Sequence, residues 1–137
     1  MIGIGFAERL AGGHHRPGEL APDRPFALDI VARPVRDSWC VSGTVRASSI
    51  TEAALVEGRI TRDGELLRYA LSVDGAPRLA IIGRKLLRFR DLYASLSTFR
   101  GSFLDDGCEV ATIVARVDLR NEWRYCLRNL RLSMRAP

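Results

Sequence analysis

The feature that most constrains this fold is a two-residue alternation of apolar and polar side chains, which begins at Phe26 and continues to Val117. Successive side chains of a β-strand point to opposite faces, so this period predicts strands with one apolar face. In the first segment the apolar face carries Phe26, Leu28 and Ile30. About eight such segments follow one another, at residues 26–33, 39–48, 56–61, 66–73, 79–82, 86–89, 92–98 and 111–117.

Turn-forming residues separate these segments. Asp63-Gly64 predicts a type I′ hairpin, whose two central residues need positive φ, and Asp74-Gly75 predicts a second turn. Gly83 interrupts an apolar run, which indicates a β-bulge or a close backbone approach. Connections this short favour antiparallel neighbours, because a parallel crossover needs a dozen or more residues.

A sheet with one apolar face must bury that face, either by curling into a barrel or by folding into a sandwich. We expect a mainly all-β fold, an antiparallel calycin-like or lipocalin-like barrel of about eight strands. Such a barrel is filled by side chains or holds one small ligand. Small residues on the predicted inward face favour a ligand cavity: Gly43, Gly58, Ala94, Ala111 and Ala115.

The 137 residues fit a single domain of three parts. Residues 1–25, broken by Gly12-Gly13 and by prolines, are expected to form an arm or a lid, and residues 26–119 the barrel. In residues 120–137, Trp123, Leu127 and Met134 recur at helical spacing, and a last strand through Tyr125 is the alternative.

Composition and charge limit the function classes. The net charge is +5, and Lys85 is the only lysine among 21 basic residues. The arginines are scattered along the sequence without an obvious patch, so nucleic-acid binding is not expected. No apolar run reaches the roughly 20 residues of a membrane span, and the N-terminus lacks the pattern of a secretory signal. We therefore expect a cytoplasmic protein.

No motif indicates a cofactor or a metal. The three cysteines, Cys40, Cys108 and Cys126, form no CxxC pair and are expected to be buried free thiols. His14-His15 has no acidic or cysteine partner nearby in the sequence. Phosphate-loop and nucleophile-elbow patterns are missing too.

Three residues are candidates for chemistry on a bound ligand. Glu8 lies between Phe6 and Leu10, where desolvation would suit a general acid or base. Tyr69 is expected to point inward and to donate a hydrogen bond, and Lys85 to bind an anionic group. Each also has a plain structural interpretation, as a surface carboxylate, a core tyrosine and a solvated lysine. The predicted ligand-binding wall is Trp39, Val41, Leu67, Leu71, Ile81, Leu96 and Ile113.

The outward face is not fully polar, which indicates a homodimer or another interface. The apolar residues expected there are Leu55, Leu66, Ile82, Tyr93, Phe99, Val110 and Val114.

Short motifs resemble a family. Phe6-Ala7-Glu8-Arg9-Leu10-Ala11-Gly12 is similar to the FxExMxG opening of a small β-rich domain that accompanies bacterial cholesterol-oxidase-like flavoproteins of the glucose-methanol-choline class. Residues 69–75 and 79–85 are similar to its YxLxF…dG…LxGxK stretch, and residues 91–99 to the strand after it. Leu10 replaces the usual methionine. The flavin domain is missing, so the resemblance implies no oxidoreductase activity and no cofactor. It implies a lipocalin-like module for a sterol-, lipid- or polyketide-like ligand.

Two functions follow as hypotheses, beside a third, a basic nucleic-acid binder, which the scattered arginines make the least expected of the three. In the first, the barrel binds an apolar small molecule in its lumen and guides its cyclisation or isomerisation without a cofactor, as in bacterial natural-product pathways. In the second, the domain is a non-catalytic module that docks on a partner enzyme.

Overall fold

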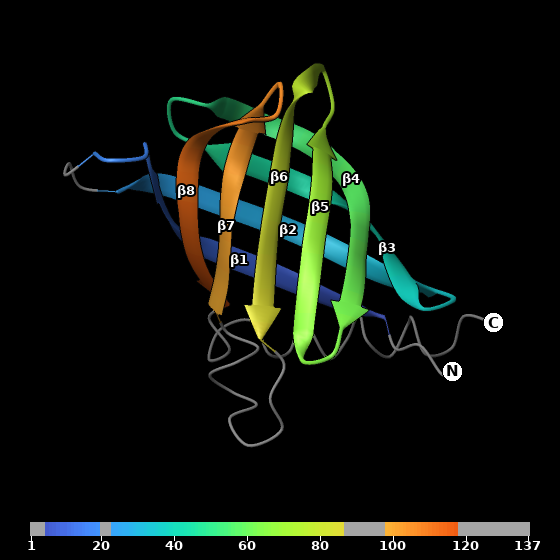
Figure 1. Ribbon diagram of the computed structural model, residues 1–137. Coiled ribbons are helices and arrows are strands. Elements are labelled where there is room, and N and C mark those ends of the chain that lie inside the picture. The colour runs from blue at the N-terminus through green and yellow to red at the C-terminus, as the bar shows by residue number, and fades with distance from the viewer. Residues whose placement is uncertain (1–4, 20–22, 87–97, 118–137) are drawn as a thin grey trace.

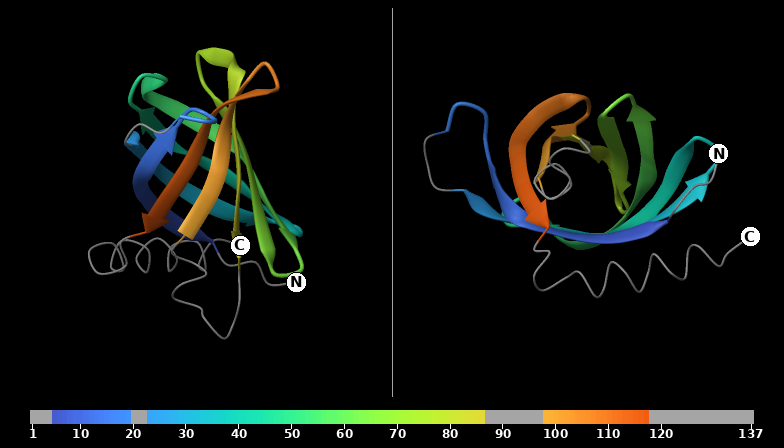
Figure 2. Two further views of the ribbon diagram at one scale, coloured as in Figure 1. Left: turned by 60° about the vertical axis from the view of Figure 1, so that its left-hand side comes forward. Right: turned by 90° about the horizontal axis from the view of Figure 1, so that it is seen from below.

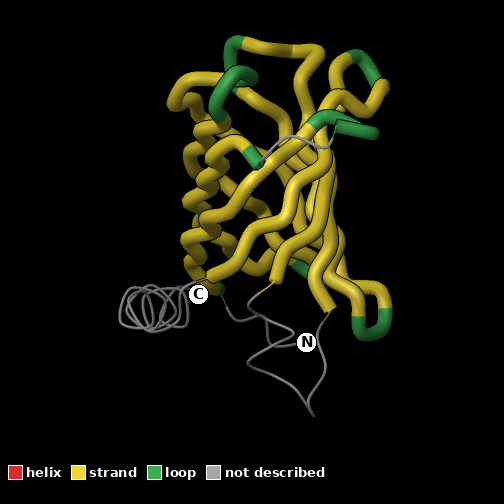
Figure 3. Tube along the Cα trace, turned by 90° about the vertical axis from the view of Figure 1, so that its left-hand side faces the viewer, coloured by secondary structure: helices red, strands yellow, loops and turns green. Residues whose placement is uncertain are grey.

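The computed structural model describes residues 5–19, 23–86 and 98–117, and nearly all of these residues lie in β-strands (Figure 3). Eight strands follow one another in the sequence (Figure 1). Their bounds are β1 Phe6–His15, β2 Arg24–Val35, β3 Ser38–Ala47, β4 Thr51–Asp63, β5 Leu66–Val73, β6 Ala76–Leu86, β7 Thr98–Asp105 and β8 Cys108–Val117.

The strands form one closed antiparallel barrel in sequence order. Each strand pairs with the next, and β1 also pairs with β8, which closes the ring (Figure 2). The predicted barrel is therefore confirmed, and the sandwich is excluded. Closure leaves the barrel without an unpaired sheet edge, so every strand has a hydrogen-bonded neighbour on both sides.

The N-terminal segment corrects one prediction. Residues 6–15, expected to be part of an arm or lid, form β1, where Leu10 faces Leu28 on one side and Val117 on the other. Gly12 does not break this strand; a Cβ there would overlap the Val114 carbonyl, so the glycine lets β1 curve closely against β8. The chain turns only after His15, and within the described ranges the barrel spans 6–117 rather than 26–119.

The segment around β6 and β7 corrects a second prediction. Residues 79–82 and 86–89 were expected to be two strands, but β6 runs without a break from Ala76 to Leu86. The strand expected at residues 92–98 lies outside the described residues except for Thr98, which begins β7. Because the phase of β7 differs from the expected one, Phe99 is fully buried rather than outward. The strand count of about eight is correct because the missed β1 compensates for the extra predicted strand.

The interior is filled mainly by the predicted apolar face, with Leu28, Ile60 and Ile113 among its fully buried side chains. The small inward residues have a different role from the expected one. A Cβ at Gly43 or Gly58 would overlap the backbone carbonyl of the neighbouring strand, so these glycines permit strand bending and do not leave lumen space.

Gly83 confirms the predicted close approach. The group that lies against it is the Phe99 ring from β7, which a Cβ at position 83 would overlap. The predicted turns are present as well, with positive φ at Gly64 and Gly75. At the first of these the central residues are Gly64 and Glu65, and only Gly64 has positive φ, so the turn is not type I′.

Exposure at several surface positions differs from expectation. Cys40 and Cys108 are free but exposed, contrary to the predicted burial. Leu55 and Ile82 are exposed as predicted, at 62% and 43%, whereas Val110 packs against the core. The predictions for Cys126, Tyr93, Ala94 and residues 120–137 fall outside the described residues. No helix in the described ranges is long and apolar enough to cross a membrane.

Candidate functional site

The three residues predicted for chemistry meet inside the barrel. Glu8 projects from β1, Tyr69 from β5 and Lys85 from β6, and all three are more than nine-tenths buried. The Tyr69 hydroxyl donates to Glu8 Oε1 at 2.6 Å, and Lys85 Nζ donates to Glu8 Oε2 as an ion pair. We call these three side chains the Glu8 cluster.

Strand register explains why they meet. Tyr69 faces Gly83 across β5 and β6, and Lys85 lies two residues further along β6, so both side chains point to the same interior face. The bare backbone at Gly83 leaves space for the Phe99 ring, which packs edge-on against Tyr69 at 5.1 Å between centroids. In a ring of eight strands β1 lies opposite β5, so the contacts to Glu8 cross the lumen.

Electrostatics in the Glu8 cluster favour a neutral phenol. Burial raises the pKa of Tyr69 well above its usual value, and the negative charge of Glu8 and the hydrogen bond to it add to the effect. Lys85 Nζ also lies 6.0 Å from the centre of the Tyr69 ring. A carboxylate held between an ammonium and a phenol can accept or relay a proton, and here its polar neighbours satisfy it inside an apolar core.

The other predicted ligand-binding residues are mostly core. Trp39 is half-buried and packs edge-on against Phe6 at 5.9 Å between ring centroids. Leu96 lies outside the described residues. Five further residues are buried in the barrel interior as predicted: Val41, Leu67, Leu71, Ile81 and Ile113.

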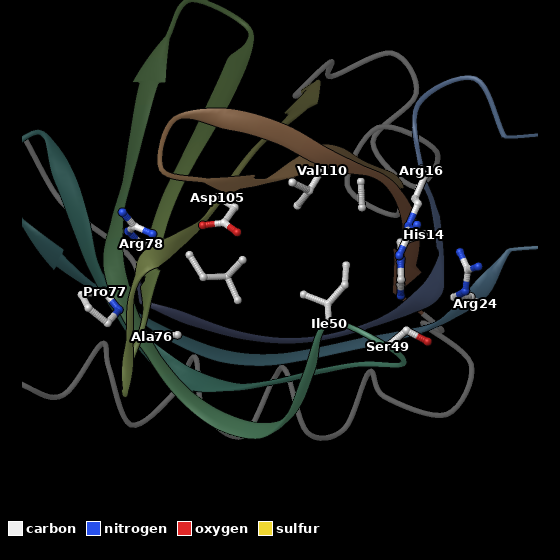
Figure 4. Close-up of a pocket in the computed structure, with 12 residues that line it drawn as sticks. His14, Arg16, Arg24, Ser49, Ile50, Ala76, Pro77, Arg78, Asp105 and Val110 are labelled. Atoms are coloured by element: carbon white, nitrogen blue, oxygen red, sulfur yellow. The ribbon is translucent and has the colours of Figure 1, made fainter.

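A cavity of about 460 Å³ opens at one end of the barrel, where β1, β3, β5 and β7 end (Figure 4). We call this end the mouth. Its apolar wall is formed by Ile50, Leu79, Val110 and Ala111, contributed by the β3–β4 loop, β6 and β8. Because Glu8 and His14 are six residues apart on the same strand, the Glu8 cluster and the mouth are separated by about 20 Å along β1.

His14 stands in the wall of the mouth and is 1% exposed. Its Nε2 donates to the Ser48 carbonyl at 2.8 Å, which leaves Nδ1 as an acceptor, and Nδ1 has no hydrogen-bond partner among the described residues. Burial lowers the pKa of His14 below its ordinary value, in spite of the hydrogen bond to Ser48. The ring is therefore neutral at physiological pH, and its edge contact with Phe103 holds its orientation.

Three arginines border the mouth, and their partners differ. Arg24 makes two hydrogen bonds to Glu19, at 3.0 and 3.1 Å, and the bonded guanidinium lowers the pKa of Glu19 to about 2. Arg78 lies 3.8 Å from an Asp106 oxygen with both side chains largely exposed. The Arg16 guanidinium makes no salt bridge in the described part of the chain, and its charge acts on Glu19 only at longer range, so it remains available to a ligand.

The cavity at the mouth was not predicted from the sequence. Its residues come from several chain segments and share no motif. Period-two alternation does extend through residues 6–15, where Glu8, Leu10 and His14 fall on one face, and this signal could have identified His14 as inward. His15 pairs with Asp23 at 3.0 Å, and no group of three metal-ligating side chains occurs in the described ranges.

No protein-family profile, curated protein or solved structure matches this chain. The resemblance to the flavoprotein-associated domain therefore extends, as a finding, only to the eight-stranded antiparallel barrel. Function must be argued from the geometry of the chain itself.

Proposed function

We propose that this barrel binds an amphipathic small molecule at its mouth, with the apolar body inside and an acidic group at the rim. The observation that carries the proposal is the cavity of about 460 Å³ with an apolar wall and an arginine border. Its volume falls in the range of roughly 300–1,000 Å³ that is usual for small-molecule sites. No cofactor is required for binding.

The two kinds of lining have separate roles. Ile50, Leu79 and Val110 offer apolar contact area to a chain or ring system. Arg16 would receive a carboxylate or similar anion, because a guanidinium makes paired hydrogen bonds to such groups. This chemistry agrees with the sterol-, lipid- or polyketide-like ligand implied by the sequence resemblance.

A fluorescent fatty acid, cis-parinaric acid, and its methyl ester test this proposal. The acid should bind more tightly than the ester, and Arg16→Gln should remove most of the difference. Arg33→Gln, an exposed arginine on β2 away from the mouth, is the matched control. Val110→Asp should weaken both probes, because it places a charge in the apolar wall. Equal binding of both probes to the native protein and to Val110→Asp would contradict a mouth site.

Cofactor-independent cyclisation or isomerisation is a second candidate, favoured by the Glu8 cluster. A neutral phenol could polarise a carbonyl while the carboxylate takes a proton from the neighbouring carbon. The substrate of such a reaction would have to lie beside the Glu8 cluster, because the mouth is about 20 Å away along β1. Its turnover should be lost in both Tyr69→Phe and Glu8→Gln, with binding of cis-parinaric acid at the mouth retained. Unchanged turnover in both variants would assign the cluster to stability alone.

A further inference from the structure

Four arginines that are far apart in the sequence come together on the outer face of the barrel. They are Arg59 on β4, Arg68 on β5, Arg84 on β6 and Arg100 on β7, and all are exposed. β5, β6 and β7 lie side by side at the front of Figure 1. The scattered distribution in the sequence therefore hides a patch, and the expectation that no patch exists was wrong.

Strand register aligns three of them. Arg68 is directly opposite Arg84, and Arg84 is directly opposite Arg100, so the three form a row perpendicular to the strands. Thr61 faces Arg68 on the other side, which makes Arg59, two residues earlier, a diagonal neighbour of the row. With strands about 4.8 Å apart, the four arginines extend over roughly 14 Å.

These arginines line a groove of about 730 Å³, which we call the arginine groove. Gly83 and Gly101, paired with each other across β6 and β7, form part of its lining. Ser102 and Thr112 also line it, but both hydroxyls lie within hydrogen-bond distance of Glu109, at 2.8 and 3.1 Å. The guanidinium groups are thus the main groups left to recognise a ligand.

The aligned arginines repel one another, which lowers the stability of the fold, and carboxylate partners do little to offset this repulsion. Like charges directly opposite each other on a sheet are destabilising. Arg68 has only a distant, exposed partner, Asp63 at 3.7 Å. Arg59, Arg84 and Arg100 have no ion-pair partner in the described ranges. Local rules broken without compensation are expected at functional sites.

We propose that the arginine groove binds the phosphate backbone of a nucleic acid. A linear row of guanidinium groups suits a linear polyanion, and guanidinium is well matched to phosphate oxygens. One strand of a duplex carries a phosphate about every 3.4 Å of axis, so roughly four phosphates fit along the row. The arginine groove lies on the outer face of paired strands, at Gly83 and Gly101, and admits a strand of phosphates, whereas a planar bilayer surface cannot enter it.

This site is separate from the mouth. The residues that line the two cavities are entirely different, and the arginine groove faces outward from the strands whose inner faces carry the core. Tyr69 is the one aromatic residue among the described residues that line the groove, and its side chain is buried in the barrel interior, so base stacking is not expected. Binding should therefore be largely independent of nucleotide sequence.

Fluorescence anisotropy with a 20-nucleotide DNA single strand and the matching duplex tests this proposal. The logarithm of the binding constant should fall with the logarithm of salt concentration with a slope of about −3, for roughly four phosphate contacts. Arg84→Gln should weaken binding about five- to eightfold at 0.1 M salt and reduce the slope by nearly one, since one counterion release is lost. Arg46→Gln makes the same change of charge on β3, six residues and roughly 20 Å from Cys40, which faces Arg59, and should have a much smaller effect.

Thermal unfolding of the same variants separates a binding effect from misfolding, because Arg84→Gln relieves repulsion and should not lower the melting temperature. Equal losses in Arg84→Gln and Arg46→Gln would overturn the proposal, as would undetectable binding at 50 mM salt. Tighter binding to polyglutamate or to phosphatidylserine vesicles than to DNA would overturn it too, and would assign the groove to an acidic protein or a lipid surface.

Discussion

Glu8 is the residue on which the polar interior of this barrel depends, because it holds both Lys85 and Tyr69. Replacing Lys85 with methionine would leave the carboxylate buried without its counter-charge. We expect Lys85→Met to lower the free energy of unfolding by about 3–5 kcal/mol, measured by urea denaturation. The double variant Glu8→Gln with Lys85→Met removes both charges and should recover most of this loss. Equal destabilisation of the single and double variants would contradict the buried ion pair.

Tyr69 predicts a specific dependence of stability on alkaline pH. Its pKa is raised in the folded protein, so above about pH 10 the unfolded chain loses the phenol proton while the folded chain keeps it. Since the folded state then binds more protons, the free energy of unfolding falls as pH rises through this window. Tyr69→Phe should lower stability at pH 8 by about 1.5–3 kcal/mol, through loss of a hydrogen bond to a charged group. Its stability should then decline less steeply between pH 9.5 and 11, as urea midpoints would measure. A parallel decline in both proteins would be inconsistent with a buried phenol.

His14 predicts the opposite dependence in the acidic range, where the free energy of unfolding rises with pH. Its folded pKa is lowered by burial, so below about pH 6.5 the unfolded chain binds a proton that the folded chain does not. Stability should therefore be present above that pH and decline as the pH falls. His14→Gln retains a donor for Ser48 and should flatten the decline between pH 7 and 5 in thermal unfolding. A profile that is unchanged by the substitution would mean that His14 does not titrate on unfolding.

For these residues, the sequence predicts which side chains are unusual but not which of them meet in the folded chain. Glu8 and Tyr69 could be singled out because an ionisable or phenolic group beside apolar neighbours is unusual, and Lys85 because it is the only lysine of the sequence. Their mutual contact could not, since Glu8 and Lys85 are 77 residues apart and meet only when the barrel closes. The arginine row was hidden for the same reason, because cross-strand register and not sequence spacing puts Arg84 between Arg68 and Arg100.

At the scale of the strands, β6 and β7 are fitted to each other through Gly83 and Phe99. A methyl group at position 83 would overlap the Phe99 ring, a side chain that can be shortened. Gly83→Ala should cost about 1–3 kcal/mol of overpacking, and Phe99→Leu in the same chain should offset part of it. Gly43→Ala meets a backbone carbonyl instead, so Phe99→Leu should not rescue it. Urea midpoints for the four variants measure this difference, and equal rescue at both positions would contradict the contact.

Strand prediction succeeded where the alternation was regular and failed where glycine obscured it. β2 to β5 follow the period-two pattern and were located within a few residues. In β1, Gly12-Gly13 was interpreted as interrupting any long strand or helix. The tight curvature of a closed barrel, however, uses glycine within strands. Near β7 the pattern had the wrong phase, so Phe99 was assigned to the outside.

For the whole molecule, barrel closure depends on β1, which the sequence pattern assigned to a lid. Removing a lid would leave a folded barrel, but removing β1 would expose the edges of β2 and β8 and leave Lys85 buried without Glu8. We therefore expect a chain lacking residues 1–15 to lose cooperative thermal unfolding and to associate, as seen by circular dichroism and size-exclusion chromatography.

A peptide of residues 5–15 supplies the control for that deletion. If β1 acts by pairing, the added peptide should restore a cooperative transition, because it can hydrogen-bond to both exposed edges at once. A peptide with Glu8→Gln should restore it less completely, since the Lys85 ammonium would regain a strand but not its counter-charge. A truncated chain that unfolds cooperatively as a monomer without any peptide would show that β1 is dispensable for the barrel. The strand and lid interpretations of this segment therefore predict opposite results in a single experiment.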